Sequence, residues 1–186
     1  MANDSSTGGY LAPVAASPPE TDKDLDTILQ AMVTGISGLP GNLVRPRWQP
    51  TVPKQPEPTT NWCAIGIQRQ VLVDMPYIAH DGTGNGQDNF MRYEEIDLLC
   101  SFYGPQGMQY ASAVRDGIYI PQNSEAIKQH NMAFIGASDI IPAPDFVNQQ
   151  WIRRFDMTIR LRRQITRTYQ VLNILSAETQ VTPDSF

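Results

Sequence analysis

The sequence predicts an α+β fold with a mixed, largely antiparallel β-sheet, helices that flank it, and an extended arm at the N-terminus. An amphipathic helical pattern comes first, at residues 22–36. Strand patterns follow at 62–75 and 90–104, two helical patterns come next, and the chain closes on strand patterns at 151–181. This order of elements, with no internal repeat, is typical of the α+β class.

The N-terminal arm covers residues 1–20 and consists mainly of Ser, Gly, Ala and Pro, with few large apolar side chains. Such a segment cannot bury enough surface to offset the entropy lost on ordering. We therefore expect a disordered or extended arm over 1–20, a single α+β domain over 21–178 and a C-terminal tail over 179–186.

The first helix is predicted by apolar side chains that recur three and four residues apart. Thr21 can cap it, and aspartates in the first turn suit the positive end of the helix dipole. Gly38 and Pro40 end the helix, and further prolines force an extended connection up to residue 61. The apolar positions of this helix are Leu25, Ile28, Leu29, Met32, Val33 and Ile36.

The middle of the chain alternates between segments with a strand-like pattern and segments with a helix-like pattern of apolar residues. Residues 62–75 and 90–104 are rich in β-branched and aromatic side chains and predict strands. Helical spacing follows at 105–121, and a shorter helix at 122–132 could be capped by Asn123 or Ser124. A short strand and a proline-rich turn are expected within 132–150.

The clearest strand pattern lies at 151–164, where apolar and polar residues alternate with a period of two. We expect its apolar side to pack on the first helix, at Leu25, Leu29, Met32 and Ile36. A further strand is predicted at 166–181. The apolar side of the 151–164 strand consists of Phe155, Met157, Ile159 and Leu161.

Composition excludes several classes of protein. Charged residues make up 18% of the chain against a usual value of about 25%, so much of the surface must be neutral or covered by partners. The net charge of -5 disfavours a general nucleic-acid binder. Cys63 and Cys100 lie in apolar runs and are predicted to be buried free thiols. With no signal peptide and no apolar span, we expect a soluble protein made in a reducing cytoplasm.

The most motif-like stretch is "HDGTGNGQDNF" at residues 80–90. It lacks the Lys-Ser/Thr ending of a phosphate loop and leads into a strand, not a helix. Asp81, Asn85 and Asp88 partly resemble a calcium loop, but the closing acid is missing. We predict a loop between two strands, with a projecting tip at Gly82, Gly84, Asn85 and Gly86.

No catalytic, cofactor-binding or metal-binding residue is predicted. His80 and His130 have no Cys, His or Glu partner at ligand spacing. The chain also lacks a Gly-x-Ser-x-Gly nucleophile elbow. The sequence therefore predicts a protein that is not an enzyme.

Six arginines lie between residues 153 and 167, out of 14 basic residues in all. Two interpretations are open: contact with nucleic acid, or charge pairing with Glu95 and Asp97 of the same chain or of a neighbouring subunit. The acidic total favours pairing. Neighbouring strand residues point to opposite faces, so Glu95 shares a face with Asp97 and not with Glu94. The interface candidates are Arg154, Arg160, Arg162, Glu95, Asp97 and Asp156.

A series of motifs resembles the neck, or tail-terminator, proteins of tailed bacteriophages. The similarity covers residues 22–175 in order and spacing. Its most specific positions are Arg45-Pro46-Arg47-Trp48, Ser101-Phe102-Tyr103-Gly104-Pro105 and Trp151-x-x-Arg154-x-Asp156. The first twenty residues have no counterpart in the family, and the glycine stretch has little. The motifs read "VRPRWQPTVPKQP", "NWCAIGI", "SFYGPQG", "RDGIYIPQNSEAI" and "FVNQQWIRRFDMTIRLRRQITRTY".

The resemblance implies a structural subunit of a homo-oligomeric ring, a hexamer, that closes the tail tube and joins it to the head connector. It implies assembly in the host cytoplasm and a final place in the virion. Connector or head-completion proteins, the tail tube and sheath proteins are the implied partners, with genomic DNA passing through the lumen without specific binding. No membrane, cofactor or catalysis is implied.

Three other functions stay open at this point. The chain could be a head-completion or connector protein of the same neck, which would also form rings. It could use the glycine loop in nucleotide or phosphate chemistry. It could also be a nucleic-acid-binding module that uses the arginine strand, with a salt-dependent affinity for duplex DNA.

Overall fold

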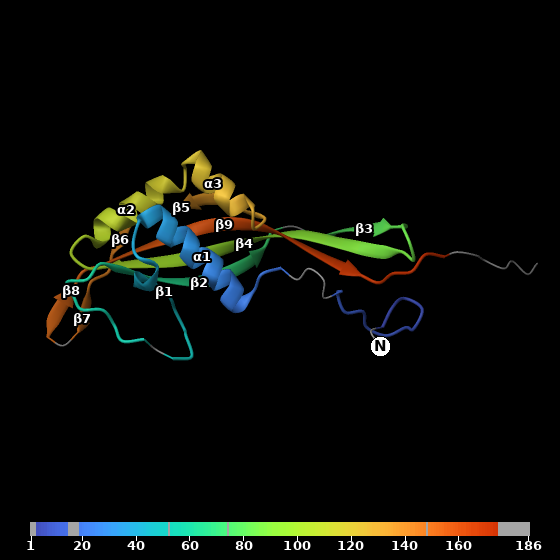
Figure 1. Ribbon diagram of the computed structural model, residues 1–186, viewed down its shortest axis with the longest axis horizontal. Coiled ribbons are helices and arrows are strands. Elements are labelled where there is room, and N and C mark those ends of the chain that lie inside the picture. Colours follow the sequence, from blue (N-terminus) through green and yellow to red (C-terminus); the bar gives the residue numbers. More distant parts are fainter. Residues whose placement is uncertain (1–2, 15–18, 52, 74, 148, 175–186) are drawn as a thin grey trace, which may run out of the picture. The chain divides into compact units, whose positions relative to one another are not determined.

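The computed structural model describes residues 3–14, 19–51, 53–73, 75–147 and 149–174. It confirms the predicted α+β class, with helices beside a mixed, mostly antiparallel sheet (Figure 1). The helices are α1 (Asp22–Ser37), α2 (Gly107–Gly117) and α3 (Pro121–Lys128), with a 3-10 turn η1 at Gly41–Leu43. The strands are β1 (Val44–Pro46), β2 (Trp62–Leu72), β3 (Tyr77–Asp81), β4 (Gln87–Tyr103), β5 (Met132–Ala137), β6 (Ile141–Pro142), β7 (Asp145–Val147), β8 (Gln150–Ile152) and β9 (Arg154–Tyr169).

Contacts divide the chain into two compact units, which we describe separately. The larger unit consists of the described residues of Pro19–Met75 and Arg92–Ile165. The smaller unit consists of Pro76–Met91 with the described residues of Met1–Pro18 and Thr166–Phe186. The long strands β4 and β9 contribute residues to both units. The expected division into an arm, one domain and a tail stays a prediction.

The main sheet has the strand order β1-β2-β4-β9-β5, with β3 also paired to β4 and β6 to β9. The β1–β2 pair is parallel, whereas β2, β3, β5 and β6 each pair antiparallel to their neighbour. The register of β2 on β4 places Cys63 opposite Phe102 and shifts between Ile67 and Arg69. Antiparallel neighbours suit a sheet that is covered on one face only.

The core of the larger unit lies between the helices and one face of its sheet. Figure 1 shows α1, α2 and α3 gathered on one side of the strands. Leu25 and Leu29 share one buried cluster with Met157, Ile159 and Leu161, as the two periodicities predict. The predicted members Met32, Ile36 and Phe155 are partly buried against that cluster.

Both cysteines lie in this core as free thiols, which confirms the sequence prediction. Burial raises the pKa of the Cys63 thiol, because the thiolate would lose its solvation there. A thiol held in its neutral form is a poor nucleophile. Cys63 therefore acts as a small apolar side chain in the core.

Two details of the helices differ from expectation. Thr21 precedes α1 as predicted, but its side chain makes no capping hydrogen bond; its backbone oxygen accepts from the N–H of Asp24 at 3.1 Å. The shorter helix begins at Pro121, so the predicted caps Asn123 and Ser124 are wrong and lie inside it. Proline suits the first helical position because that residue needs no N–H donor.

The separate strand predicted at 166–181 is also wrong. β9 continues without a break to Tyr169, and residues 170–174 belong to no strand; 175–181 lie outside the described residues. The alternation of buried and exposed residues runs on through Arg163 and Ile165. With no turn residue there, nothing in the sequence ends the strand at residue 164.

Among the helices in the described part of the chain, none is both long and apolar enough to cross a membrane.

Candidate interaction surface

The sheet of the larger unit has one face that the helices do not cover, which we call the helix-free face. On β4, Ile96, Leu98 and Cys100 point into the core, whereas alternate residues such as Glu95 and Asp97 point to the other side. The residues on the helix-free face are Ala64 and Gly66 of β2, Glu95, Asp97, Ser101 and Tyr103 of β4, and Arg154, Asp156, Arg160 and Arg162 of β9. All six predicted interface candidates therefore lie on one surface.

One end of this face holds the predicted charge pairs, formed within the chain. Arg162 Nη2 donates to Glu95 Oε1 at 2.8 Å. Asp97 lies between two arginines: Arg69 Nε donates to its Oδ2 at 2.8 Å, and Arg160 Nε lies 3.5 Å from its Oδ1. The Arg160 side chain is 53% exposed, so its guanidinium borders solvent.

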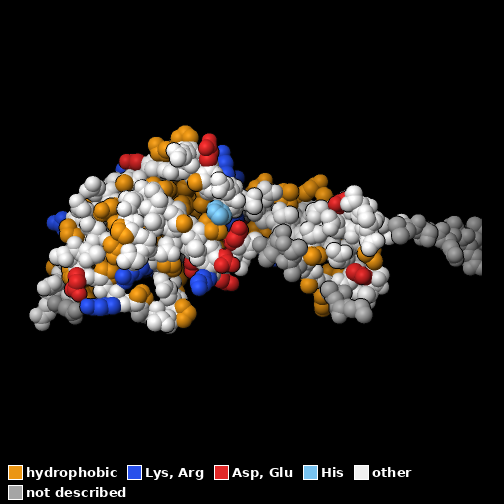
Figure 2. Space-filling view, viewed as in Figure 1, with side chains coloured by type: hydrophobic (Ala, Val, Ile, Leu, Met, Phe, Trp, Pro, Cys, Tyr) orange, Lys and Arg blue, Asp and Glu red, His pale blue; other side chains and the backbone are white. Residues whose placement is uncertain are grey.

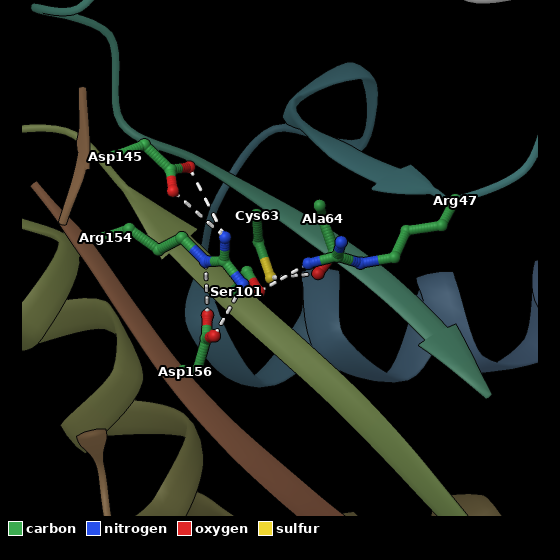
Figure 3. Close-up of polar contacts among 7 residues, drawn as sticks. All are labelled: Arg47, Cys63, Ala64, Ser101, Asp145, Arg154 and Asp156. Carbon is green, nitrogen blue, oxygen red and sulfur yellow. Dashed lines mark hydrogen bonds and ion pairs between the residues drawn. The ribbon is translucent and has the colours of Figure 1, made fainter. Parts of the chain in front are cut away.

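The other end of the face carries a more enclosed charge cluster, which Figure 3 shows around Arg154. Arg154 donates to both carboxylate oxygens of Asp156, at 2.8 and 2.6 Å, and through Nη1 to Asp145 at 3.2 Å. Arg47 reaches the same region and donates to the Ser101 hydroxyl. A guanidinium held by two carboxylates has a fixed orientation.

The pKa values of this cluster follow from its contacts. The hydrogen bond to Asp156 raises the pKa of Arg154 above its ordinary value. Burial by itself would raise the pKa of Asp156, but hydrogen bonds from Arg154 and Ser101 and the nearby positive charges outweigh it and leave this pKa below its usual value. Both groups are therefore charged near neutral pH.

Aromatic rings lie beside the Arg154 cluster. Trp62 and Tyr103 stack with their centroids 4.3 Å apart, and the Arg154 guanidinium lies 5.9 Å from the Tyr103 centroid. A pocket of about 520 Å³ opens here, and its lining includes Arg45, Arg47, Trp48, Trp62, Tyr103 and Asp145. Trp48 is 75% exposed at its rim. The β7–β8 pair adds the exposed rings of Phe146 and Trp151, 4.9 Å apart. A cluster of exposed aromatic residues is typical of a protein-binding surface.

One ion pair was not foreseen from the sequence. Glu94 and Arg163 are each 5% exposed and hydrogen-bond to each other on the helix-covered face. Arg163 Nη1 also donates to the backbone oxygen of Glu20 at 2.6 Å. The signal was present, because Glu94 is two residues from the buried Ile96, and Arg163 is two residues from the buried Leu161.

The glycine stretch joins β3 to β4 in an antiparallel hairpin of the smaller unit. The strand β3 was not predicted. Gly82, Gly84 and Asn85 are exposed, whereas Gly86 is buried beside Asn173. Asn173 lies 87 positions away in the sequence, and its side chain donates to the backbone oxygen of Gly82 at 2.9 Å. No local pattern could have indicated this contact. The projecting tip stays a prediction.

The described residues offer no arrangement for metal chemistry: no three His, Cys, Asp or Glu side chains among them lie together as metal ligands would. Figure 2 shows that charged side chains are sparse on the face in view, with acidic ones gathered near the start of α1, where Asp22 and Asp24 lie. Apolar side chains appear there at several separate places.

The sequence matches a known protein family. The family described as phage neck terminator protein matches residues 23–185 of this chain. A search of curated proteins found no match. The matched segment includes the whole of the larger unit's sheet and both long strands, and it confirms the resemblance carried by the sequence motifs.

Proposed function

This chain belongs to the phage neck terminator family, and we propose that it acts as one subunit of a hexameric ring that closes the tail tube and joins it to the head connector. The family is one of structural proteins of the phage neck, so the chain is a virion component with a structural role. The family match over residues 23–185 is the single observation that carries the proposal. The ring, its copy number and the junction with the head are the proposed part.

We assign the contact between neighbouring subunits to the helix-free face. A ring needs a heterologous interface, in which two different surfaces of the subunit meet and the rotation closes. The helix-free face supplies one such surface, because no helix covers it and hydrogen bonds within the chain already orient several of its charged side chains. The surface that it meets on the next copy must offer carboxylates to its arginines.

Arg160 is the best placed of these arginines to reach a second copy. Among the described residues its side chain donates no hydrogen bond, and its Nε lies 3.5 Å from Asp97 Oδ1. Its guanidinium therefore keeps N–H donors for a carboxylate of the neighbour, in the two-bond geometry that arginine favours. Arg154 is different, because Asp156 and Asp145 already engage it.

The aromatic residues near the Arg154 cluster suit a second contact, with other neck proteins. Trp48, Phe146 and Trp151 are largely exposed, and aromatic side chains are enriched at protein interfaces. We propose that connector or head-completion proteins, or the tail tube and its sheath, cover this surface in the particle. Genomic DNA would pass through the ring without specific binding.

A phage that lacks this protein tests the proposal. We expect its lysate to contain separate heads and tails under the electron microscope, because the junction cannot form. Infectious particles of normal appearance from such a phage would overturn the neck role. If the protein is instead a head-completion protein, DNA-filled heads should be unstable and leak before tails attach.

The interface is tested by reversing one charge. Arg160→Glu should block ring formation or head–tail joining, yet leave the subunit folded by circular dichroism. The matched control is Arg115→Glu on α2, which reverses another solvent-exposed arginine, on the helix side. Normal particles from Arg160→Glu would overturn the role of that arginine and leave the ring itself untouched.

A further inference from the structure

We propose that His80 strengthens the hold of the glycine loop on Asn173 when its imidazole carries two protons, so that deprotonation of His80 weakens the attachment of this segment. All the residues involved belong to the smaller unit. His80 would act as a conformational switch within one subunit, independently of the proposed hexamer.

The imidazole of His80 has an oxygen at each nitrogen. Nδ1 lies 2.7 Å from Oδ1 of Asp88, and Nε2 lies 2.9 Å from Oδ1 of Asn173. The first contact is made within the hairpin, because His80 and Asp88 are paired across β3 and β4. The second contact reaches a residue that follows the end of β9.

The orientation of the Asn173 amide is fixed by the glycine loop. Its Nδ2 donates to the backbone oxygens of Gly82 and Gly84, at 2.9 and 3.2 Å. A carbonyl oxygen can only accept, so a flipped amide would place its own oxygen against two acceptors. The amide oxygen must therefore face His80.

Both oxygens that face the His80 ring can only accept, because one belongs to a carboxylate and the other to this fixed amide. A neutral imidazole has one N–H and one lone pair, whereas the imidazolium donates from both nitrogens. Only the charged ring can make both hydrogen bonds. After deprotonation, one nitrogen lone pair would face an oxygen lone pair at hydrogen-bonding distance.

The backbone of the loop is shaped to receive the same segment. Asn173 N–H donates to the Asn85 oxygen at 2.8 Å. Gly86 has φ +93°, and a Cβ there would lie 2.6 Å from Asn173 Oδ1 and 2.7 Å from Asn173 N. A side chain at position 86 would thus exclude Asn173. The glycine-rich motif therefore accommodates another part of this chain, where a phosphate loop would accommodate an anion.

The charges around His80 all favour its protonated form. Asp88 on β4 and Asp81 on β3 face it, while residues 170–174 contain no titratable side chain. The N-terminal arm meets that segment through Ser5, and its nearest acid, Asp4, binds Ser6. The hydrogen bond to Asp88, followed by that to Asn173, raises the pKa of His80 above its ordinary value of about 6.5.

The direction of the pH effect follows from this raised pKa. Protonation of His80 and binding of Asn173 reinforce each other, so the segment is held most tightly below about pH 6.5, and this added hold is lost as the pH rises through the raised pKa of His80. Each pKa unit by which the Asn173 contact alone raises the pKa of His80 corresponds to a tenfold weaker binding of Asn173 after His80 is deprotonated.

Nuclear magnetic resonance on the full chain tests the proposal. The protein has two histidines, so His130→Gln assigns the two titrations and serves as a control that leaves the His80 contacts intact. We expect a His80 pKa above about 6.5. We also expect the exchange protection of the Asn173 amide, corrected for intrinsic exchange, to fall as the pH crosses this pKa, about tenfold for each unit of the pKa rise that Asn173→Ala removes.

Two variants separate the contacts. Asp88→Asn and Asn173→Ala should each lower the pKa of His80, because the first removes the carboxylate charge and the second removes the amide oxygen that accepts from the imidazolium. A His80 pKa at or below about 6.5 in the unmodified protein would overturn the proposal. So would Asn173 protection that stays constant while His80 titrates, and neither result depends on whether a variant folds.

Discussion

Two ion pairs in this protein lie next to each other in sequence and on opposite faces of the same sheet. Glu94 and Arg163 pair on the helix-covered face, where each is 5% exposed. Glu95 and Arg162 pair on the helix-free face, where the arginine side chain is 47% exposed. Both are Glu–Arg ion pairs, but they differ in how much solvent reaches them. The burial of the first pair makes it part of the core, whereas solvent reaches the second pair.

The largest expected effect comes from breaking the buried pair. Glu94→Gln leaves the Arg163 guanidinium buried without its carboxylate, which should lower the free energy of unfolding by about 3–5 kcal/mol. Urea denaturation followed by fluorescence measures it. A loss below about 1 kcal/mol would mean that water reaches Arg163 and that the two pairs are alike.

A second variant sharpens this test. Replacing both partners by apolar residues, Glu94→Leu with Arg163→Met, removes the charges together. Such replacements of a buried pair are often neutral or stabilising. We expect the double variant to be more stable than Glu94→Gln alone, and lower stability would assign the pair a structural role beyond charge compensation.

The same difference between faces should appear for uncharged residues of β9. Leu161→Ala removes a fully buried side chain and should cost about 2–5 kcal/mol. Thr158→Ala on the helix-free face should change the melting temperature little. Equal losses from the two variants would contradict the assignment of faces.

On the helix-free face, Glu95→Gln should cost less than about 1 kcal/mol, because solvent already screens Arg162. The same denaturation series that measures Glu94→Gln provides the comparison. A loss as large as that of Glu94→Gln would show that the surface pair is not available for a partner.

The smallest expected effect is on the stability of the protein at acidic pH. The pKa of Asp156 is lowered in the folded state, so its contribution is present above its unfolded value of about 3.9 and is lost as the pH falls through the folded value. In Asp156→Asn, the free energy of unfolding should therefore fall less between neutral pH and about pH 3 than it does in the unmodified protein. An unchanged acid titration curve would exclude Asp156 as a contributor.

The sequence predicted the helices and strands whose apolar residues recur at a regular spacing. The α1 pattern from Leu25 and the β9 pattern from Phe155 both led to the core that the structure contains. Alternation also placed Glu95 with Asp97 on one face of their strand, and Arg160 with Arg162 on one face of theirs, and the structure pairs these two sets. These predictions succeeded because a period of two or of 3.6 is a local property of the chain.

The contacts that join distant segments could not be predicted in this way. The partner of Arg163 depends on which neighbouring strand packs beside β9, and Asn173 meets a loop 87 positions earlier. The short strand β3 carries no long alternation, and Asn123 was misassigned as a cap because Pro121 already begins the helix. Each of these features depends on tertiary contacts that single-segment patterns do not contain.

The most direct test of the account is a cryo-electron microscopy map of the virion neck at a resolution that traces side chains. We predict a closed ring of six copies between tail tube and head connector, with Arg160 of each copy facing a carboxylate of the next. A neck that is fully accounted for by other proteins, with no copy of this chain, would contradict the account.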